Sequence, residues 1–220
     1  MAPSSIVLIF VEETTAHATP SAVAVHGFSP VLWTSVGNGV DDKTFIYALQ
    51  NMSAQTVEVY VNMSSSETYF IEAVDVTGVS GIQAGNCGGQ SNTGGTALSC
   101  TAAPTTKVSN ETVFSGYATS GGTRPGAYTE GTGQTRLNLL TSGANAGDTD
   151  DLILSNLRTF ATYVNTTLSA NYASAGVALY PTSGGSTSGP GTLWVSQGAY
   201  DPADARALFL HEACISGSGS

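Results

Sequence analysis

Few side chains in this 220-residue sequence could perform catalysis. The histidines are His17, His26 and His211. His211 is followed by Glu212, but the second histidine of a zinc-protease helix is missing, and no Gly-x-Ser-x-Gly turn of a serine hydrolase occurs. Acidic residues on or near predicted strands are Glu58, Glu72, Asp75 and Glu130. Because no two of them stand out as a glycosidase pair, the sequence predicts a protein that is not an enzyme and has no catalytic residues.

Asp148, Asp150 and Asp151 form the most concentrated acidic segment, and they follow Gly147 where a turn is predicted. Carboxylate oxygens gathered at a turn are ligands that calcium prefers. The spacing does not match an EF-hand loop, and a solvated acidic turn that caps the next element is the alternative. Calcium bound by these three aspartates is therefore the one cofactor that the sequence suggests.

Cys87 and Cys100 enclose a polar, glycine-rich segment, residues 88–99, that has little apolar surface to hold it in place. A disulfide closing so short a loop would contribute about 3 kcal/mol. We predict this disulfide, with two free thiols as the alternative; a zinc site is disfavoured because no Cys-x2-Cys pair or nearby histidine is present. Cys214 is left over, either as a buried small side chain or as an intermolecular link.

The composition describes a neutral, hydroxyl-rich surface with an acidic balance. Only 10% of the residues are charged, and the formal net charge is −10 because Lys and Arg together number 6. This balance disfavours nucleic acid and anionic membranes as partners and is compatible with an extracellular or cell-surface location. Four Asn-x-Ser/Thr sequences would then be glycosylation acceptors. They begin at Asn51, Asn62, Asn110 and Asn165.

Short strands separated by turns account for most of the chain. Residues 44–49, 56–62 and 69–76 alternate or run apolar in the manner of strands. The segment 151–168 fits helix and strand spacing alike, and its β-branched and aromatic residues favour a strand. Residues 115–135, rich in Gly, Thr and Ser, are predicted to form a surface loop or weak edge strands. About ten strands without sustained helical periodicity predict an all-β, antiparallel β-sandwich of immunoglobulin-like or jelly-roll-like type.

The first apolar run stands apart, because nothing beside it in the sequence is an obvious partner. It consists of Ile6, Val7, Leu8, Ile9, Phe10 and Val11. It is too short to span a membrane, and no Lys or Arg precedes it as in a signal peptide. Such a strand must be buried, either in its own sheet or in a neighbouring molecule; a trimmed leader is the third alternative. We predict an extended N-terminal segment (residues 1–18) that acts as a donor strand, one sandwich domain (residues 19–216) and a flexible tail (residues 217–220).

The chain resembles the extracellular β-sandwich filament subunits of archaeal bundling pili and threads and the related bacterial biofilm-matrix fibres. The resemblance is carried by the free apolar start, residues 5–11, and by the strand pair of residues 44–62. Those subunits polymerise by donor-strand complementation. The resemblance implies a secreted structural protein whose partner is itself, in a head-to-tail homopolymer, with no enzymatic activity. Two alternatives remain open: a secreted carbohydrate-binding module, in which Trp33, Trp194 and several tyrosines form a stacking platform, and a viral capsid jelly roll.

Overall fold

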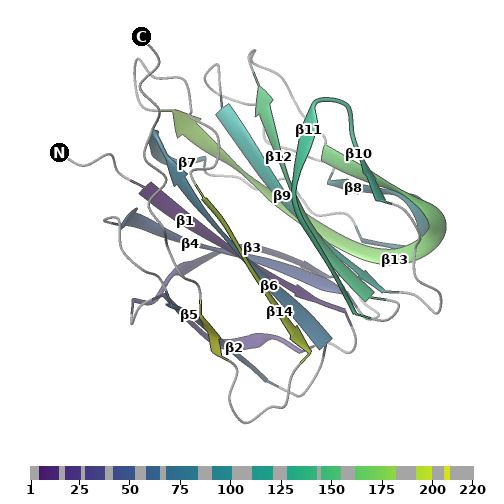
Figure 1. The fold of residues 1–220 in the computed structure, drawn as a ribbon, viewed down its shortest axis with the longest axis horizontal. Coiled ribbons are helices and arrows are strands. Elements are labelled where there is room, and N and C mark those ends of the chain that lie inside the picture. Colours follow the sequence, from purple (N-terminus) through teal and green to yellow (C-terminus); the bar gives the residue numbers. More distant parts are fainter. Residues whose placement is uncertain are drawn as a thin grey trace.

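A central five-stranded sheet runs through the computed structural model of the chain, and a further sheet lies on each side of it (Figure 1). Every strand pairing among the described residues is antiparallel. The structure describes residues 5–14, 18–25, 28–37, 42–52, 58–64, 68–83, 91–100, 111–120, 128–142, 145–154, 162–181, 192–199 and 206–208.

The central sheet has the strand order β14-β6-β1-β4-β3. Its strands are β1 (Ser5–Glu13), β3 (Val31–Gly37), β4 (Lys43–Met52), β6 (Thr68–Thr77) and β14 (Thr192–Ala199). The first described strand of the chain therefore lies in the middle of this sheet, between β4 and β6. Within one chain, the predicted N-terminal segment and the predicted sandwich domain share a sheet.

A seven-stranded sheet and a three-stranded sheet flank the central one. The larger sheet has the strand order β10-β13-β9-β12-β11, and β7 and β8 also pair with β13. Its strands are β7 (Val79–Ile82), β8 (Ser91–Cys100), β9 (Glu111–Ser120), β10 (Tyr128–Glu130), β11 (Gln134–Ser142), β12 (Asn145–Leu154) and β13 (Thr162–Pro181). The smaller, in the order β15-β5-β2, consists of β2 (Pro20–Val25), β5 (Glu58–Met63) and β15 (Arg206–Leu208).

Two apolar cores separate the three layers. The main core, between the central and the seven-stranded sheet, contains Ile6, Leu8, Phe10, Ile46, Ala48, Val74, Val76, Val79, Ile82, Phe114, Ala175, Val177 and Leu179. The minor core, between the central and the three-stranded sheet, contains Val7, Ile9, Val11, Val25, Phe45, Tyr47, Val59, Val61, Tyr69, Ile71 and Ala73. Even-numbered residues of β1 enter the main core and odd-numbered ones the minor core, as the two-residue repeat of a strand requires. Because both faces of β1 are covered, its sequence is continuously apolar from Ile6 to Val11 rather than alternating.

The chain passes from one layer to the next at tight connections. Gly78 adopts a φ of 75° between β6 and β7, a conformation that favours glycine, and so redirects the chain from the central to the seven-stranded sheet. At the end of β2, the amides and carbonyls of Val25 and Phe28 exchange two hydrogen bonds of 2.8 Å. These two bonds lie between the end of the three-stranded sheet's β2 and the start of β3.

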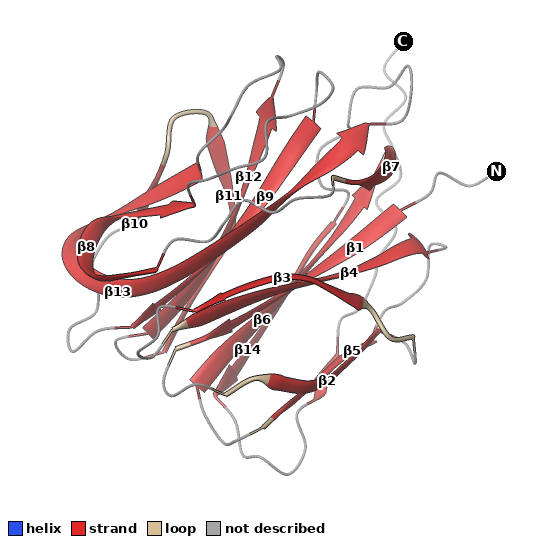
Figure 2. Cartoon of the chain, turned by 180° about the vertical axis from the view of Figure 1, so that it is seen from behind, coloured by secondary structure: helices blue, strands red, loops and turns tan. Residues whose placement is uncertain are grey.

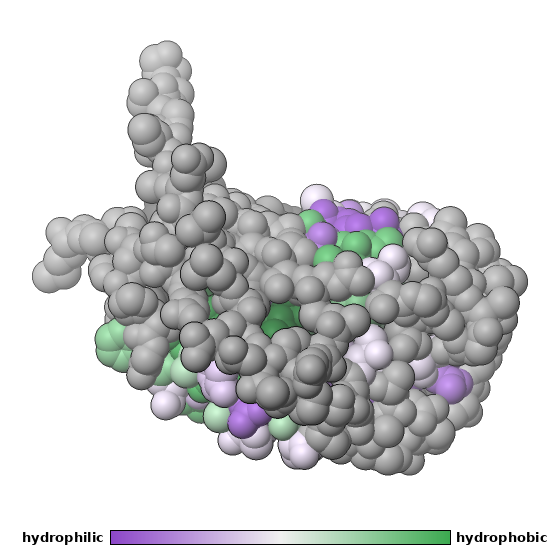
Figure 3. Space-filling view, turned by 60° about the horizontal axis from the view of Figure 1, so that its bottom comes forward, coloured by the Kyte–Doolittle hydropathy of each residue, from purple (hydrophilic) through white to green (hydrophobic). Residues whose placement is uncertain are grey.

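One edge of the central sheet presents apolar side chains to solvent. β3 pairs only with β4, and the most exposed large apolar residues of the described chain lie on it or just before it: Phe28 (55% exposed), Val31 (63%) and Leu32 (47%). Figure 3 shows one face of the molecule on which small apolar and polar patches of the described chain reach the surface. These exposed residues provide matched controls for substitutions in the two cores.

The all-β antiparallel sandwich predicted from the sequence is confirmed, since the described residues contain strands and no helix (Figure 2). None of them forms a helix able to cross a membrane. Two local predictions are wrong. Residues 115–120, predicted as part of a surface loop or of weak edge strands, complete the fully buried strand β9, which lies between β13 and β12. Residues 91–99, predicted as a polar loop, belong to β8 and pair with β13.

Both corrections concern strands of similar composition. The strands β8 and β9 are built largely from small residues, which carry little hydrophobicity of their own. In β9, Gly116 lies where an added Cβ would come within 2.7 Å of the Phe10 ring. The central sheet thus supplies the bulky side chains at this contact, and small residues opposite allow the two sheets to approach closely.

Candidate functional site

The candidate site is the groove between β4 and β6 that β1 occupies, here called the β1 groove. β1 pairs with β4 from Ser5 to Glu13, with Leu8 opposite Ala48, and with β6 over the same residues, with Leu8 opposite Val74. All nine residues of β1 are buried. Because β4 and β6 each use one edge for β1 and are not neighbours in the sheet, the groove exists as a binding surface for one strand.

The predicted donor-strand residues all lie inside the groove. Their exposed fractions are at most 4%, and Leu8, Ile9, Phe10 and Val11 are at 0%. Complete burial of one such side chain contributes about 1.5 to 3 kcal/mol. The apolar run is therefore a major source of stability for whichever domain contains it.

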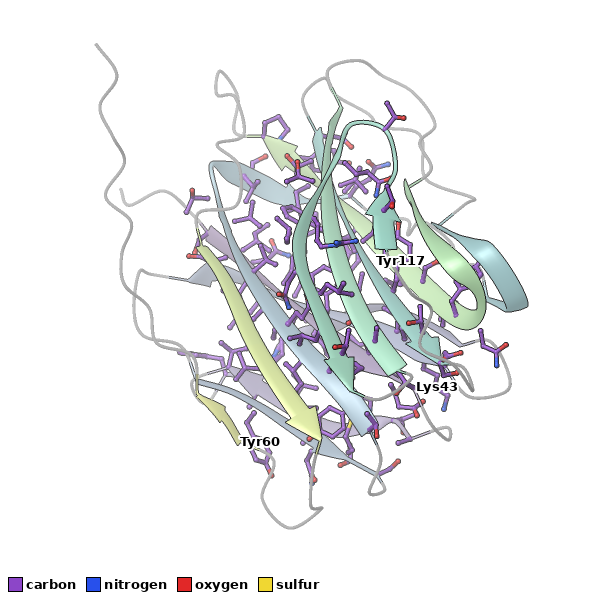
Figure 4. All side chains as sticks on the ribbon, turned by 45° about the vertical axis from the view of Figure 1, so that its right-hand side comes forward. Lys43, Tyr60 and Tyr117 are labelled. Carbon is purple, nitrogen blue, oxygen red and sulfur yellow. The ribbon has the colours of Figure 1, made fainter. Side chains whose placement is uncertain are left out.

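A carboxylate lies at the far end of this apolar strand. Glu12 is completely buried, opposite Thr44 on β4 and Phe70 on β6. Its Oε1 accepts a hydrogen bond of 3.0 Å from the amide of Tyr117 on β9, across the main core. Figure 4 labels Tyr117 in the seven-stranded sheet.

Two glycines make room for this carboxylate. An added Cβ at Gly116 on β9 would lie 2.8 Å from Glu12 Oε1, and one at Gly147 on β12 would overlap Glu12 Oε2. Separations under 3 Å are closer than Cβ atoms tolerate, so a side chain at either position would displace the acid. We call the space bounded by Gly116, Gly147 and the Tyr117 amide the carboxylate recess.

Thr44 makes a second polar connection beside the recess. Its hydroxyl donates to the carbonyl of Ala173 on β13 (2.8 Å) and accepts from the amide of Ala118 on β9 (3.2 Å). One side chain of the central sheet thus joins two neighbouring strands of the seven-stranded sheet. Together with Glu12, it gives the main core a polar contact of fixed geometry.

Replacing Thr44 with Val is expected to lower the free energy of unfolding by about 2 kcal/mol, because the shape is kept while two buried backbone groups lose this hydrogen-bond partner. Urea denaturation monitored by circular dichroism measures the change. The matched control is Thr135→Val on β11, an exposed position where the same substitution should change stability by less than about 0.5 kcal/mol. Equal losses at both positions would contradict a bridging role for Thr44.

Tyr47 lies beside β1 in the minor core, opposite Ile9 and 9% exposed. Burial raises the pKa of its phenol above the ordinary value of 10.0, since the charged form is poorly solvated there. The unfolded chain therefore releases this proton at a lower pH than the folded chain does. The associated stability is fully present below the ordinary pKa and is lost as the pH rises through the raised one.

We expect the free energy of unfolding to fall more steeply above pH ~10 in the parent protein than in a Tyr47→Phe variant, by up to about 1.4 kcal/mol per pH unit. Urea midpoints measured at several alkaline pH values give the two slopes. Because the other tyrosines are common to both proteins, they cancel in the difference. Identical slopes would show that the phenol of Tyr47 titrates alike in the folded and unfolded chains.

The structure describes the predicted disulfide and glycosylation residues only in part. Cys87 lies outside the described residues, and Cys100 ends β8 without a described side chain, so the disulfide stays a prediction. Of the glycosylation candidates, Asn62 is exposed on β5, Asn51 and Asn165 lie on β4 and β13 without described side chains, and Asn110 lies outside the described residues.

The aspartates predicted for calcium lie within strand β12 and not at a turn. In the backbone pairing with β11, Asp148 is opposite Leu139, Asp150 is opposite Arg136, and Asp151 is opposite Thr135. The side chains of these three aspartates lie outside the described part, so calcium binding stays a prediction. Among the residues that the structure describes, no group of three or more His, Cys, Asp or Glu is placed to hold a metal ion.

Of the two tryptophans predicted for a carbohydrate platform, one has a described side chain. Trp33 on β3 is half-buried and packs against the main core. Trp194 lies on β14, and its side chain is outside the described part. The three histidines also fall outside the described residues.

Sequence reasoning missed Glu12, Thr44, Gly116 and Gly147 as a set. Glu12 stands next to the apolar run and reads as its solvated end, yet the strand continues through Glu13 and both acids are buried. A usable signal was the presence of acidic residues directly after a run that must itself be buried. Comparisons of the chain with protein-family models, with curated proteins and with solved structures found no match.

Proposed function

We propose that this protein is a structural subunit of an extracellular filament or pilus, in which β1 of one copy occupies the β1 groove of the next. The observation that carries the proposal is the position of β1. A strand that is apolar from Ile6 to Val11 and buried on both faces lies between two strands that do not pair with each other. Backbone hydrogen bonds to β4 and β6 give such a strand affinity, and the two cores take its alternate side chains.

Exchange between copies preserves every contact of the strand. A β1 supplied by a second copy meets the same β4, β6 and core residues, so the free energy of insertion is nearly equal for either source. The outcome then depends on the connection that follows β1 and on protein concentration. If each copy gives its strand to the next without closing a ring, the product is a filament.

The described residues of the connection after β1 make hydrogen bonds within their own chain. Thr14 donates from its amide and its hydroxyl to the carbonyl of Thr68, each at 3.2 Å. The amide of Thr19 donates to Ser64 Oγ at 3.0 Å, and Lys43 Nζ donates to the carbonyl of Ala18 at 3.5 Å. Each such bond contributes about 1 kcal/mol, little beside the burial of the whole strand.

The charge balance supports apolar strand exchange as the force for assembly. With a formal net charge of −10, copies of the protein repel one another, and 6 Lys and Arg offer few intersubunit ion pairs. Burial of β1 is not weakened by this repulsion to any large extent at physiological salt, where charges are screened beyond about 8 Å. An exposed Asn62 on β5 fits a glycosylated outer surface.

The proposal is tested by cross-linking β1 to the β4 strand with which it pairs. Leu8→Cys and Ala48→Cys place two thiols at directly opposite positions of β1 and β4, in a Cys214→Ser background. Opposed residues of antiparallel strands are within the range that a disulfide spans. After assembly at high protein concentration and mild oxidation, a ladder of covalent multimers on a non-reducing gel is expected.

The single substitutions Leu8→Cys and Ala48→Cys, each in the same background, are the controls and should give no ladder. Negative-stain microscopy of the oxidised double variant should show filaments that survive dilution. A covalent product found only at the monomer mass would mean that each chain keeps its own β1, and would overturn the proposal. A dimer band alone would mean reciprocal exchange that closes, which also excludes a filament.

A further inference from the structure

We infer that Glu12 is the positioning residue of β1: its carboxylate, held in the recess formed by Gly116, Gly147 and the Tyr117 amide, sets the register in which the strand enters the β1 groove. The groove would thereby recognise a strand carrying a carboxylate two positions after a large aromatic residue. The inference deepens the proposed function and rests on it for exchange between copies, while its account of register applies equally within one chain.

Apolarity alone does not determine the register of this strand. Register is well specified where one face of a strand is apolar and the other polar, because a one-residue slip would expose the apolar face. In β1 both faces are apolar from Ile6 to Val11, and both are covered by a core. A slip would exchange one apolar set for another, so a more selective contact must fix the position.

The recess provides this contact by size and by hydrogen bonding. It accepts Glu12 at a 3.0 Å hydrogen bond from the Tyr117 amide, and the absence of a side chain at both glycines gives the carboxylate its space. Phe10, two residues earlier on the same face, packs its ring against Gly116. The Glu12 carboxylate and the Phe10 ring thus lie next to each other against the glycines of the seven-stranded sheet.

Slipped registers lose this fit in different ways. A two-residue slip would place either the Phe10 ring or the short Thr14 hydroxyl in the recess, where the first is too large and the second does not extend far enough. A one-residue slip would bring Glu13 to the recess, but it would turn Phe10 and Glu12 to the minor core and put Val11 against Gly116. Only the observed register places both the acid and the aromatic ring against the two glycines.

Glu13 is an internal control for the role of Glu12 in setting the register. It is the neighbouring acid, it is equally buried, and it lies opposite Lys43 on the other face of the same strand. Figure 4 labels Lys43 near the end of the central sheet and Tyr117 in the seven-stranded sheet. A general requirement for acids at the end of β1 would make the two residues equivalent, whereas the recess distinguishes them.

The experiment reads register directly with opposed thiols. Leu8→Cys is combined in turn with Ala48→Cys for the observed register, Tyr47→Cys or Leu49→Cys for one-residue slips, and Ile46→Cys or Gln50→Cys for two-residue slips. Each pair is made in the otherwise parent protein and in Glu12→Leu, Glu12→Gln and Glu13→Leu variants, all as full chains. Mass spectrometry of oxidised protein quantifies the disulfide of each pair.

We expect the Ala48→Cys pair to dominate at least tenfold in the parent, in Glu13→Leu and in the conservative Glu12→Gln, whose amide oxygen keeps the acceptor. In Glu12→Leu this preference should fall several-fold and slipped pairs should appear. Unchanged pairing in Glu12→Leu, or an equal change in Glu13→Leu, would overturn the inference.

A transposed variant decides the matter if Glu12→Leu does not fold. Phe10→Glu combined with Glu12→Phe moves the acid by two positions, so a register set by the recess would bring residue 10 opposite Thr44 and Leu8→Cys opposite Ile46→Cys. That disulfide supports the inference, and continued pairing with Ala48→Cys, or loss of folded protein, refutes it. This result is independent of the proposed function. The register is given by which pair of cysteines forms the disulfide, whereas assembly is given by whether the disulfide-linked product is a monomer or a multimer.

Discussion

Replacing Phe10 with Ala is expected to lower the free energy of unfolding by about 4 kcal/mol, because a completely buried ring in the main core is removed and the rigid sheets close only partly over the space. Urea denaturation followed by circular dichroism and tryptophan fluorescence gives the midpoint and slope. The loss is a large part of the stability of an ordinary domain, so the variant should be measured at low temperature as well.

The matched control for this prediction is Phe28→Ala. Phe28 is 55% exposed before the edge strand β3, so the same substitution there should cost less than about 1 kcal/mol. Similar losses at the two positions would mean that the ring of Phe10 is not buried as the structure has it. An unchanged denaturant slope in both variants would confirm that the midpoints report stability alone.

Replacing Gly147 with Ala is expected to cost about 3 kcal/mol. Its new Cβ would overlap Glu12 Oε2 and approach Phe70 Cβ to 2.9 Å, so the carboxylate, the ring or the two strands must shift. The effect is large for a single methyl group, because the recess is closed by backbone on one side and by β1 on the other. Denaturation in urea measures it under the conditions used for Phe10.

Gly81→Ala on β7 is the control for Gly147→Ala. There the nearest atom to an added Cβ is Tyr180 Cδ2 at 3.8 Å, an ordinary contact, and the change should stay within about 0.5 kcal/mol. A double-mutant cycle adds Glu12→Ala, which should relieve much of the loss at Gly147 because the displaced carboxylate is gone. Additive losses in the cycle would contradict direct contact between Gly147 and Glu12.

The fold class was predictable from the sequence because strands with strong β formers carry their own signal. Residues 44–49 and 69–76 appear within β4 and β6, and the ambiguous segment 151–168 contributes to β12 and β13 and to no described helix. The three-layer arrangement was not predictable in this way. A hydrophobic run such as that of β1 indicates burial, but the identity of the strands that cover each face depends on contacts distant in the chain.

The candidate site was predictable only in part, for a related reason. The apolar residues of β1 predict their own burial, whereas Glu12 resembles a solvated strand end until its hydrogen-bond partner is known. That partner is the Tyr117 amide, 105 positions away along the chain. Gly116 and Gly147 likewise read as loop or turn residues, because their role is to leave space for side chains of another sheet.

The strand β13 has a consequence for the order in which the chain can fold. Over Thr162–Pro181 it pairs with β7, β8, β9 and β10, all of which precede it in the sequence. Those strands are synthesised before their common partner exists, so the seven-stranded sheet can be completed only once residues 162–181 have emerged. Contacts of such long sequence separation slow folding, typically to milliseconds or seconds. β1, β4 and β6 lie within the first 77 residues, so the central three strands can assemble while the surface that will cover their main-core face is still being made.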